Sequence, residues 1–118
     1  MRDFRKLDVY DRSLKFVNSI YDITDEWPDN EKFGLIAQIN RASVSIPSNI
    51  SEGSARRTEK DFARFIEIAL GSAFEVETQL IISKGRNYIS KNSFLDVKEE
   101  LTIIQKQLNA LLKSMRKL

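Results

Sequence analysis

An apolar seam runs without a break through the final stretch of the chain and leaves few folds open to it. From residue 94 onward, apolar side chains alternate at spacings of three and four residues, the a/d pattern of a helix with one buried face. A helix of this kind needs apolar partners, so the pattern predicts a helix at about 91–116 within a helical bundle. The seam consists of Phe94, Val97, Leu101, Ile104, Leu108, Leu111 and Met115.

Helical periodicity predicts three further helices, at about 8–26, 31–54 and 58–84. Good N-cap residues stand near their starts, namely Asp8, Asn30 and Thr58. Trp27-Pro28 ends the first helix because the residue before proline avoids the α region, and Gly85 suits the end of the third. Four helices with short connections in 118 residues predict a single domain, 1–118. The expected fold is all-α, an antiparallel up-down-up-down four-helix bundle.

The second predicted helix combines a polar stripe with an internal proline. Pro47 removes an amide donor and costs about 3 kcal/mol in a regular helix, so we expect a kink there. Arg41 is predicted to be largely buried and paired with Glu75, or otherwise with Glu52. The stripe is either a structural or assembly network or a surface for ligand contact. The residues of the predicted network are Arg41, Ser45, Asn49, Glu52 and Glu75.

Composition removes several classes of function. The chain has no histidine and no cysteine, which excludes Ser-His and Cys-His nucleophile pairs, thiolate zinc sites and Glu-x-x-His di-iron sites. Adjacent carboxylates such as Glu99 and Glu100 do not share a helix face, so no metal site is expected. We therefore expect no enzymatic activity and no cofactor. The absence of cysteine, of an apolar leader and of a membrane-length apolar run favours a cytoplasmic protein.

Two surface features are candidates for binding. A basic corner joins the second and third helices and could contact the phosphates of RNA or DNA, although an ordinary solvated corner explains it equally well. Its residues are Arg56, Arg57, Lys60 and Arg64. Apolar rows outside the main seams exceed what one bundle face can bury, and they predict self-association. These candidate interface residues are Leu70, Phe74, Ile81, Ile103 and Leu112.

The run from Gln38 to Leu80, QINRASVSIPSNISEGSARRTEKDFARFIEIALGSAFEVETQL, resembles the four-helix-bundle family of intervening-sequence proteins. That family is named for reading frames inserted in large-subunit ribosomal RNA genes. The run also resembles the accessory variability protein of diversity-generating retroelements. These resemblances imply a ring-like homopentamer of unestablished role. The retroelement type would add a reverse transcriptase and its template RNA as partners.

Overall fold

The computed structural model describes residues 2–116, which form four α-helices and two short 3-10 helices without a strand. The 3-10 helices are η1 (Phe4–Lys6) and η2 (Asp29–Glu31). The α-helices are α1 (Asp8–Thr24), α2 (Leu35–Ser54), α3 (Glu59–Gly85) and α4 (Lys91–Met115). The fold is therefore the predicted all-α four-helix bundle. No helix in this part of the chain is long and apolar enough to cross a membrane.

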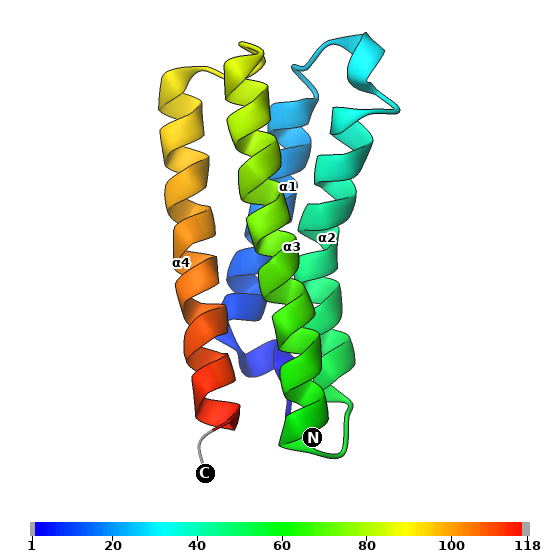
Figure 1. Cartoon of the computed structure of the whole chain (residues 1–118), viewed down its shortest axis with the longest axis vertical. Helices are drawn as coiled ribbons and strands as arrows, with labels where there is room; N and C mark the ends of the chain where they lie inside the picture. The colour runs from blue at the N-terminus through cyan, green and yellow to red at the C-terminus, as the bar shows by residue number, and fades with distance from the viewer. Residues whose placement is uncertain (1, 117–118) are drawn as a thin grey trace.

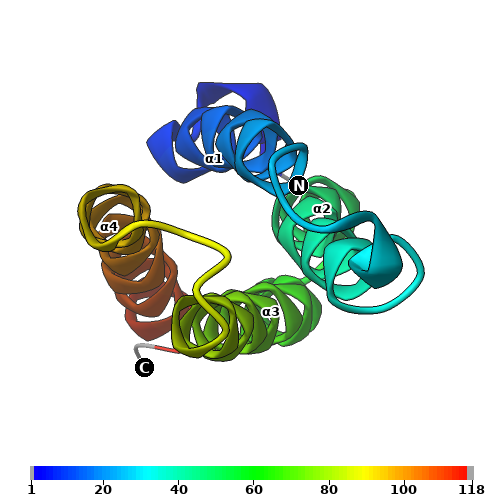
Figure 2. The ribbon, with the colours of Figure 1, turned by 90° about the horizontal axis from the view of Figure 1, so that it is seen from above.

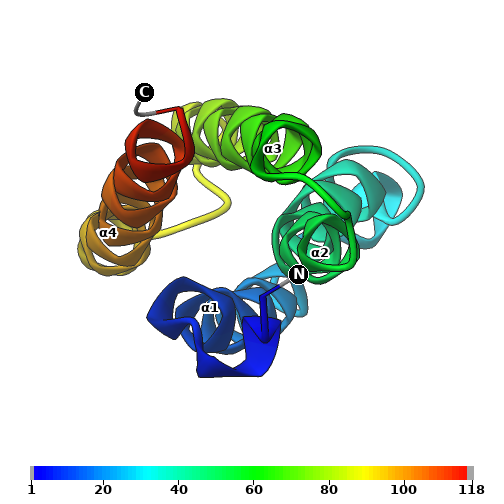
Figure 3. The same cartoon turned by 90° about the horizontal axis from the view of Figure 1, so that it is seen from below.

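The four helices lie side by side along the long axis of a molecule that measures 46 × 24 × 20 Å. Figure 1 shows successive helices running in opposite directions along this axis. Seen from above, they occupy the four corners of the bundle in chain order (Figure 2). Each helix packs against its two neighbours, and the contact between α2 and α3 is the most extensive. From below, η1 lies at the edge of the bundle beside α1 (Figure 3), and it also contacts α2.

Side-chain caps fix the starts of the last two helices. The Thr58 hydroxyl accepts a hydrogen bond from the Asp61 amide at 3.1 Å, and the Ser90 hydroxyl accepts one from the Ser93 amide at 3.1 Å. Each satisfies one of the free amides at a helix N-terminus, which is why these two boundaries follow the sequence signals. Asp8 instead lies inside the first turn of α1, and its carboxylate accepts hydrogen bonds from Arg12 and Gln107.

The second helix begins later than predicted. Residues 29–31 form η2, and Gly34, with φ −108° and ψ −112°, stands outside the α region directly before α2. The side chain of Glu31 caps α2, because its Oε1 accepts a hydrogen bond from the Leu35 amide at 3.1 Å. The predicted start near residue 31 was therefore wrong, and Asn30 is not the N-cap. From Leu35 onward α2 continues through the buried Pro47 to Ser54, so the proline does not end the helix; a kink there stays a prediction.

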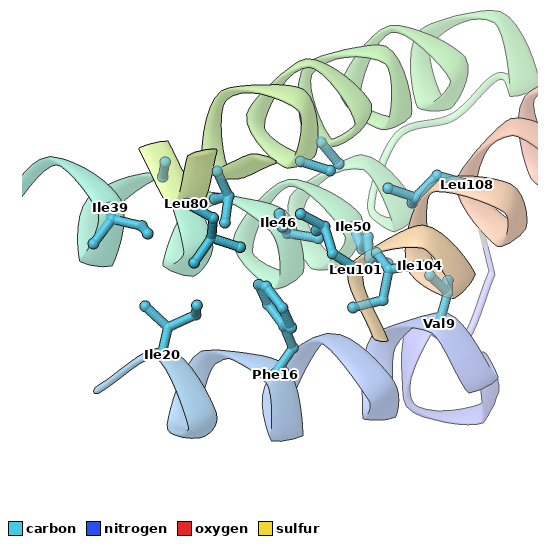
Figure 4. Close-up of a cluster of buried hydrophobic side chains, with 14 of the residues drawn as sticks. Val9, Phe16, Ile20, Ile39, Ile46, Ile50, Leu80, Leu101, Ile104 and Leu108 are labelled. Atoms are coloured by element: carbon cyan, nitrogen blue, oxygen red, sulfur yellow. The ribbon is translucent and has the colours of Figure 1, made fainter. Parts of the chain in front are cut away.

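Apolar side chains that recur mostly every three or four residues along each helix form a shared core (Figure 4). Burying an aliphatic side chain of this size contributes about 1.5–3 kcal/mol, so these contacts hold the bundle together. Leu112 belongs to this core, with 6% of its surface exposed, and its assignment to an outer apolar row was wrong. A straight helix drifts by about 20° per heptad, which carries the buried face from Leu111 toward Leu112 at the end of α4. The labelled core residues are Val9, Phe16, Ile20, Ile39, Ile46, Ile50, Leu80, Leu101, Ile104 and Leu108.

Candidate functional site

Short polar side chains line the contact between α2 and α3. The hydroxyl oxygens of Ser45 and Ser72 lie 2.9 Å apart and share a hydrogen bond. Asn49 donates from Nδ2 to the Ser45 carbonyl at 2.8 Å and to the Ser45 hydroxyl at 2.9 Å. All three side chains are half-buried. Part of the predicted polar network is thus present, with Ser72 as a member that the stripe of α2 alone did not reveal.

The long charged members of the predicted network lie outside it. Arg41 is exposed, and within residues 2–116 no carboxylate lies within ion-pair distance of it. Glu75 instead accepts a hydrogen bond from Gln79 Nε2 at 3.2 Å, and Glu52 is exposed. The predicted burial of Arg41 and its pairing with Glu75 were therefore wrong. The prediction counted residues from the turn between the second and third helices, which gives the height of Arg41 and Glu75 along the bundle but not the direction in which their side chains point. A guanidinium that can reach water avoids the cost of desolvation.

The outward face of α3 carries several large apolar side chains among its exposed polar ones. Four large side chains on it are about half exposed: Ile68, Phe74, Ile81 and Ile82, at 52%, 52%, 51% and 47%. The exposure expected of Phe74 and Ile81 is present, whereas Leu70 and Ile103 are half-buried. Ile68 and Ile82 were missed, although they stand two heptads apart on the helix and their spacing alone would place them on one side. We call these four residues the α3 outer face.

A second apolar surface follows the groove between α1 and α2. This groove encloses about 200 Å³, and Leu14 and Val44 on its rim are 39% and 38% exposed. In the view from above, the α1–α2 side of the bundle lies opposite the α3–α4 side (Figure 2). Sequence reasoning missed this groove because it forms only where α1 and α2 meet, and the spacing of residues within one helix does not show which residues of another helix lie beside them. It is lined by Tyr10, Leu14, Val17, Val44, Pro47, Ser48 and Ser51.

The basic corner lies where predicted, between α2 and α3. Arg57, Lys60 and Arg64 are exposed, and no carboxylate among residues 2–116 forms an ion pair with them. Arg56 is also exposed but places its guanidinium 4.6 Å from the centre of the Phe65 ring. The neighbouring Glu59 forms an ion pair with Arg2, in which a guanidinium nitrogen lies 3.1 Å from Glu59 Oε1. Among residues 2–116, the corner therefore presents Arg57, Lys60 and Arg64 as exposed cations without a carboxylate partner.

The opposite end of the bundle is held by a carboxylate with two donors. Glu31 accepts from the Leu35 amide through Oε1 and from the Tyr88 hydroxyl through Oε2, at 3.1 and 2.9 Å. These two hydrogen bonds, the amide first, hold the pKa of Glu31 below its usual value. Tyr88 also packs on the buried Trp27, with ring centroids 5.8 Å apart. One carboxylate thus joins η2, the start of α2 and the α3–α4 loop.

Within residues 2–116, no three acidic, histidine or cysteine side chains converge as metal ligands would. The grooves of this part of the chain are shallow seams between helices. One of them, between α1 and α4, encloses about 260 Å³ beside Asp96 and Glu100. Glu100 lies 3.7 Å from an Arg12 nitrogen and is partly neutralised by it. The geometry that stands out is therefore that of binding surfaces.

Comparisons with known proteins place this bundle in a family. The sequence profile of the 23S rRNA-intervening sequence proteins matches residues 5–110. The fold is similar to the crystal structure of a protein of unknown function from the S23 ribosomal protein family of Bacteroides thetaiotaomicron VPI-5482, with 30% identity and a TM-score of 0.82. That match covers 89% of this chain and 95% of the other. A search of curated proteins found no match. Because the profile spans most of the chain, the protein belongs to the 23S rRNA-intervening sequence protein family.

Proposed function

We propose that the protein is a non-enzymatic scaffold or adaptor that acts as a homo-oligomer, most simply a pentamer. The observation that carries this proposal is the α3 outer face, where four large apolar side chains are each about half exposed. Four large apolar side chains exposed on one helix are more than a small monomer usually leaves in water, and they favour a contact with another molecule. A second copy of the chain is the partner that is always present.

The positions of the two apolar surfaces favour a closed ring. The α3 outer face and the α1–α2 groove belong to different helices, and α3 lies diagonally across the bundle from α1 (Figure 2). If one copy's outer face packs into the next copy's groove, the interface is heterologous, and such interfaces close into rings or extend into filaments. The resemblance to ring-like pentamers of the family favours the ring with five members.

Light scattering at micromolar concentration tests this assembly. We expect a mass several times that of the 13.6 kDa chain. Replacing Phe74 and Ile81 together by lysine should release monomers, because burying two charges in an apolar interface is costly. Phe33→Lys is the matched control, since Phe33 is 90% exposed on the loop before α2 and belongs to neither surface. A wild-type monomer at this concentration would overturn the proposal.

Nucleic-acid binding is a second candidate, and the exposed cations of the basic corner favour it. A ring would repeat Arg57, Lys60 and Arg64 around its axis, which raises a weak attraction to phosphate. Filter binding with a structured RNA should then show affinity that falls steeply between about 50 and about 200 mM salt. Affinity that is absent at the lower salt, or indifferent to salt, contradicts this candidate.

The resemblance to the retroelement accessory protein adds one proposal about partners. In that case a reverse transcriptase and its template RNA should co-purify with the chain from its native cells. Mass spectrometry and sequencing of the purified material identify them directly. Recovery of the chain with neither would remove this proposal and leave the scaffold role standing.

A further inference from the structure

A groove at the basic corner lies between the first turns of α3 and the end of α4. It encloses about 470 Å³, which is within the usual range of 300–1,000 Å³ for ligand pockets. Lys60, Ala63, Arg64 and Glu67 form the α3 side. The α4 side comes from residues 115 and 116. The groove thus uses a part of α4 that the predicted basic corner did not include.

The charges around this groove are unbalanced. Arg116 forms an ion pair with Glu67 across the two helices, so these two charges cancel. Lys60 and Arg64 stand one turn apart on α3, are exposed, and have no carboxylate partner within residues 2–116. The lining therefore keeps two positive charges for a ligand. Electrostatic complementarity points to an anionic partner.

The floor of the groove narrows the choice of anion. Ala63 and Met115 are apolar and nearly buried, and methionine adapts its shape to different apolar groups. No aromatic ring lines the groove, so a nucleobase has nothing to stack on. An aliphatic side chain flanked by carboxylates fits this lining better than a nucleic acid does.

We propose that this groove is a docking site for an acidic segment of another protein, with carboxylates on Lys60 and Arg64 and an aliphatic side chain over Met115. The inference rests on the proposed adaptor role, because it names the chemistry of the partner that the scaffold would carry. Exposed charge pairs contribute little singly, so the segment gains affinity from several contacts and from repetition of the groove in an oligomer.

Isothermal titration calorimetry with a short synthetic peptide of glutamate and leucine tests this site. We expect binding that weakens as salt is raised, and that falls at least about tenfold when Lys60 and Arg64 are both changed to glutamate. The matched control changes Lys32 and Lys91 to glutamate at the other end of the bundle, where both are exposed. It alters net charge equally and should leave binding within about twofold of the wild type.

Three outcomes would overturn the inference. The first is that the wild type does not bind the peptide, and the second is that both double variants lower the peptide affinity equally. The third is that the wild type binds an oligouridine of similar length more tightly than the peptide and that K60E/R64E loses this oligouridine binding. A peptide with serine in place of leucine should also bind more weakly, because the apolar floor then has no partner. Light scattering on the same samples is a separate readout: an oligomer that does not bind the peptide refutes only the groove, and a monomer refutes only self-association.

Discussion

Gly53 lies at a close approach between α2 and α3. A Cβ atom built there would lie 2.6 Å from the Phe65 Cβ atom and 2.8 Å from Cδ1 of the buried Phe62. Alanine at this position should therefore push α2 and α3 apart and lower the free energy of unfolding by about 1–3 kcal/mol, as overpacking does. Gly71→Ala is the matched control, because a Cβ there meets nothing within 4 Å. It should stabilise α3 by about 0.5–1 kcal/mol.

Urea unfolding followed by circular dichroism, at one protomer concentration, measures both changes. The physical account fails if the two alanines shift the midpoint in the same direction. The residues around Gly53 in the sequence do not indicate this contact. The reason is that the close approach depends on which residues of α3 face it, and that is settled by packing.

The carboxylate of Glu31 makes one part of the stability depend on pH. Its pKa is lowered in the folded state, so its contribution is fully present above the ordinary value of about 4.3 and is lost as the pH falls through the lower folded value. Glu31→Gln keeps an oxygen for the Leu35 amide but removes the charge. The stability difference between wild type and variant should therefore be larger at neutral pH than in acid. Urea midpoints across this range measure it, and a difference independent of pH would contradict it.

Arg41 is a residue whose burial could not be predicted from the sequence. Counting residues from the α2–α3 turn gave its height along the bundle, but burial also depends on the direction of the side chain. Ser45 and Asn49, one and two turns further along, are half-buried while Arg41 is exposed. Short polar side chains can stay in a close contact between helices, whereas a long charged one extends to water. Side-chain length and direction, rather than spacing alone, decided which members of the polar stripe belong to the network.

At the scale of the elements, the polar contact between Ser45 and Ser72 couples α2 to α3. A double-mutant cycle to alanine should give a coupling energy of about 1 kcal/mol, as expected for one hydrogen bond between partly buried groups. Helix propensity changes cancel in the cycle. A second cycle with Ser48→Ala in place of Ser45→Ala should be additive, because Ser48 is exposed and shares no hydrogen bond with Ser72. Equal coupling in both cycles would rule out a specific contact.

The helices themselves could be predicted because their signals are local. The a/d seam of α4 and the caps Thr58 and Ser90 depend on residues within one or two turns, and both predicted starts lie within one residue of those observed. The start of α2 could not be predicted in this way. Its cap is Glu31, which is also held by Tyr88, 57 residues further along the chain. A helix start could be predicted where the capping residue is identified by its sequence neighbours, and it could not where the capping side chain is held by a residue distant in the sequence.

For the whole molecule, assembly should appear in thermal stability. If the native state is an oligomer, the unfolding temperature rises with protein concentration, because dilution favours separated and unfolded chains. We expect this rise for the wild type and for Phe33→Lys. We expect none for the variant with lysine at Phe74 and Ile81. Calorimetry over a range of concentrations checks it, and a wild-type transition that does not move would contradict assembly through the α3 outer face.

The candidate surfaces of the whole molecule were only partly within reach of the sequence. Apolar residues off the seam were visible at Phe74 and Ile81, and the basic corner was visible as a run of cations. The grooves were not visible, because each is formed by two helices whose relative rotation is fixed by the core. Met115 illustrates this: the sequence identifies it as a core residue, while the fold also makes it the floor of a basic groove.

The packing of Trp27 on Tyr88 has a practical consequence. Trp27 is the only tryptophan of the chain, and it is buried where α1 gives way to η2, with 4% of its surface exposed. Indole emission shifts to longer wavelength when water reaches the ring, so intrinsic fluorescence reports on this end of the bundle alone, whereas ellipticity reports on all four helices. Emission that changes before ellipticity means that the loop end opens first, and coincident curves mean one cooperative unit. The chain therefore carries its own probe of local opening, and no label needs to be attached.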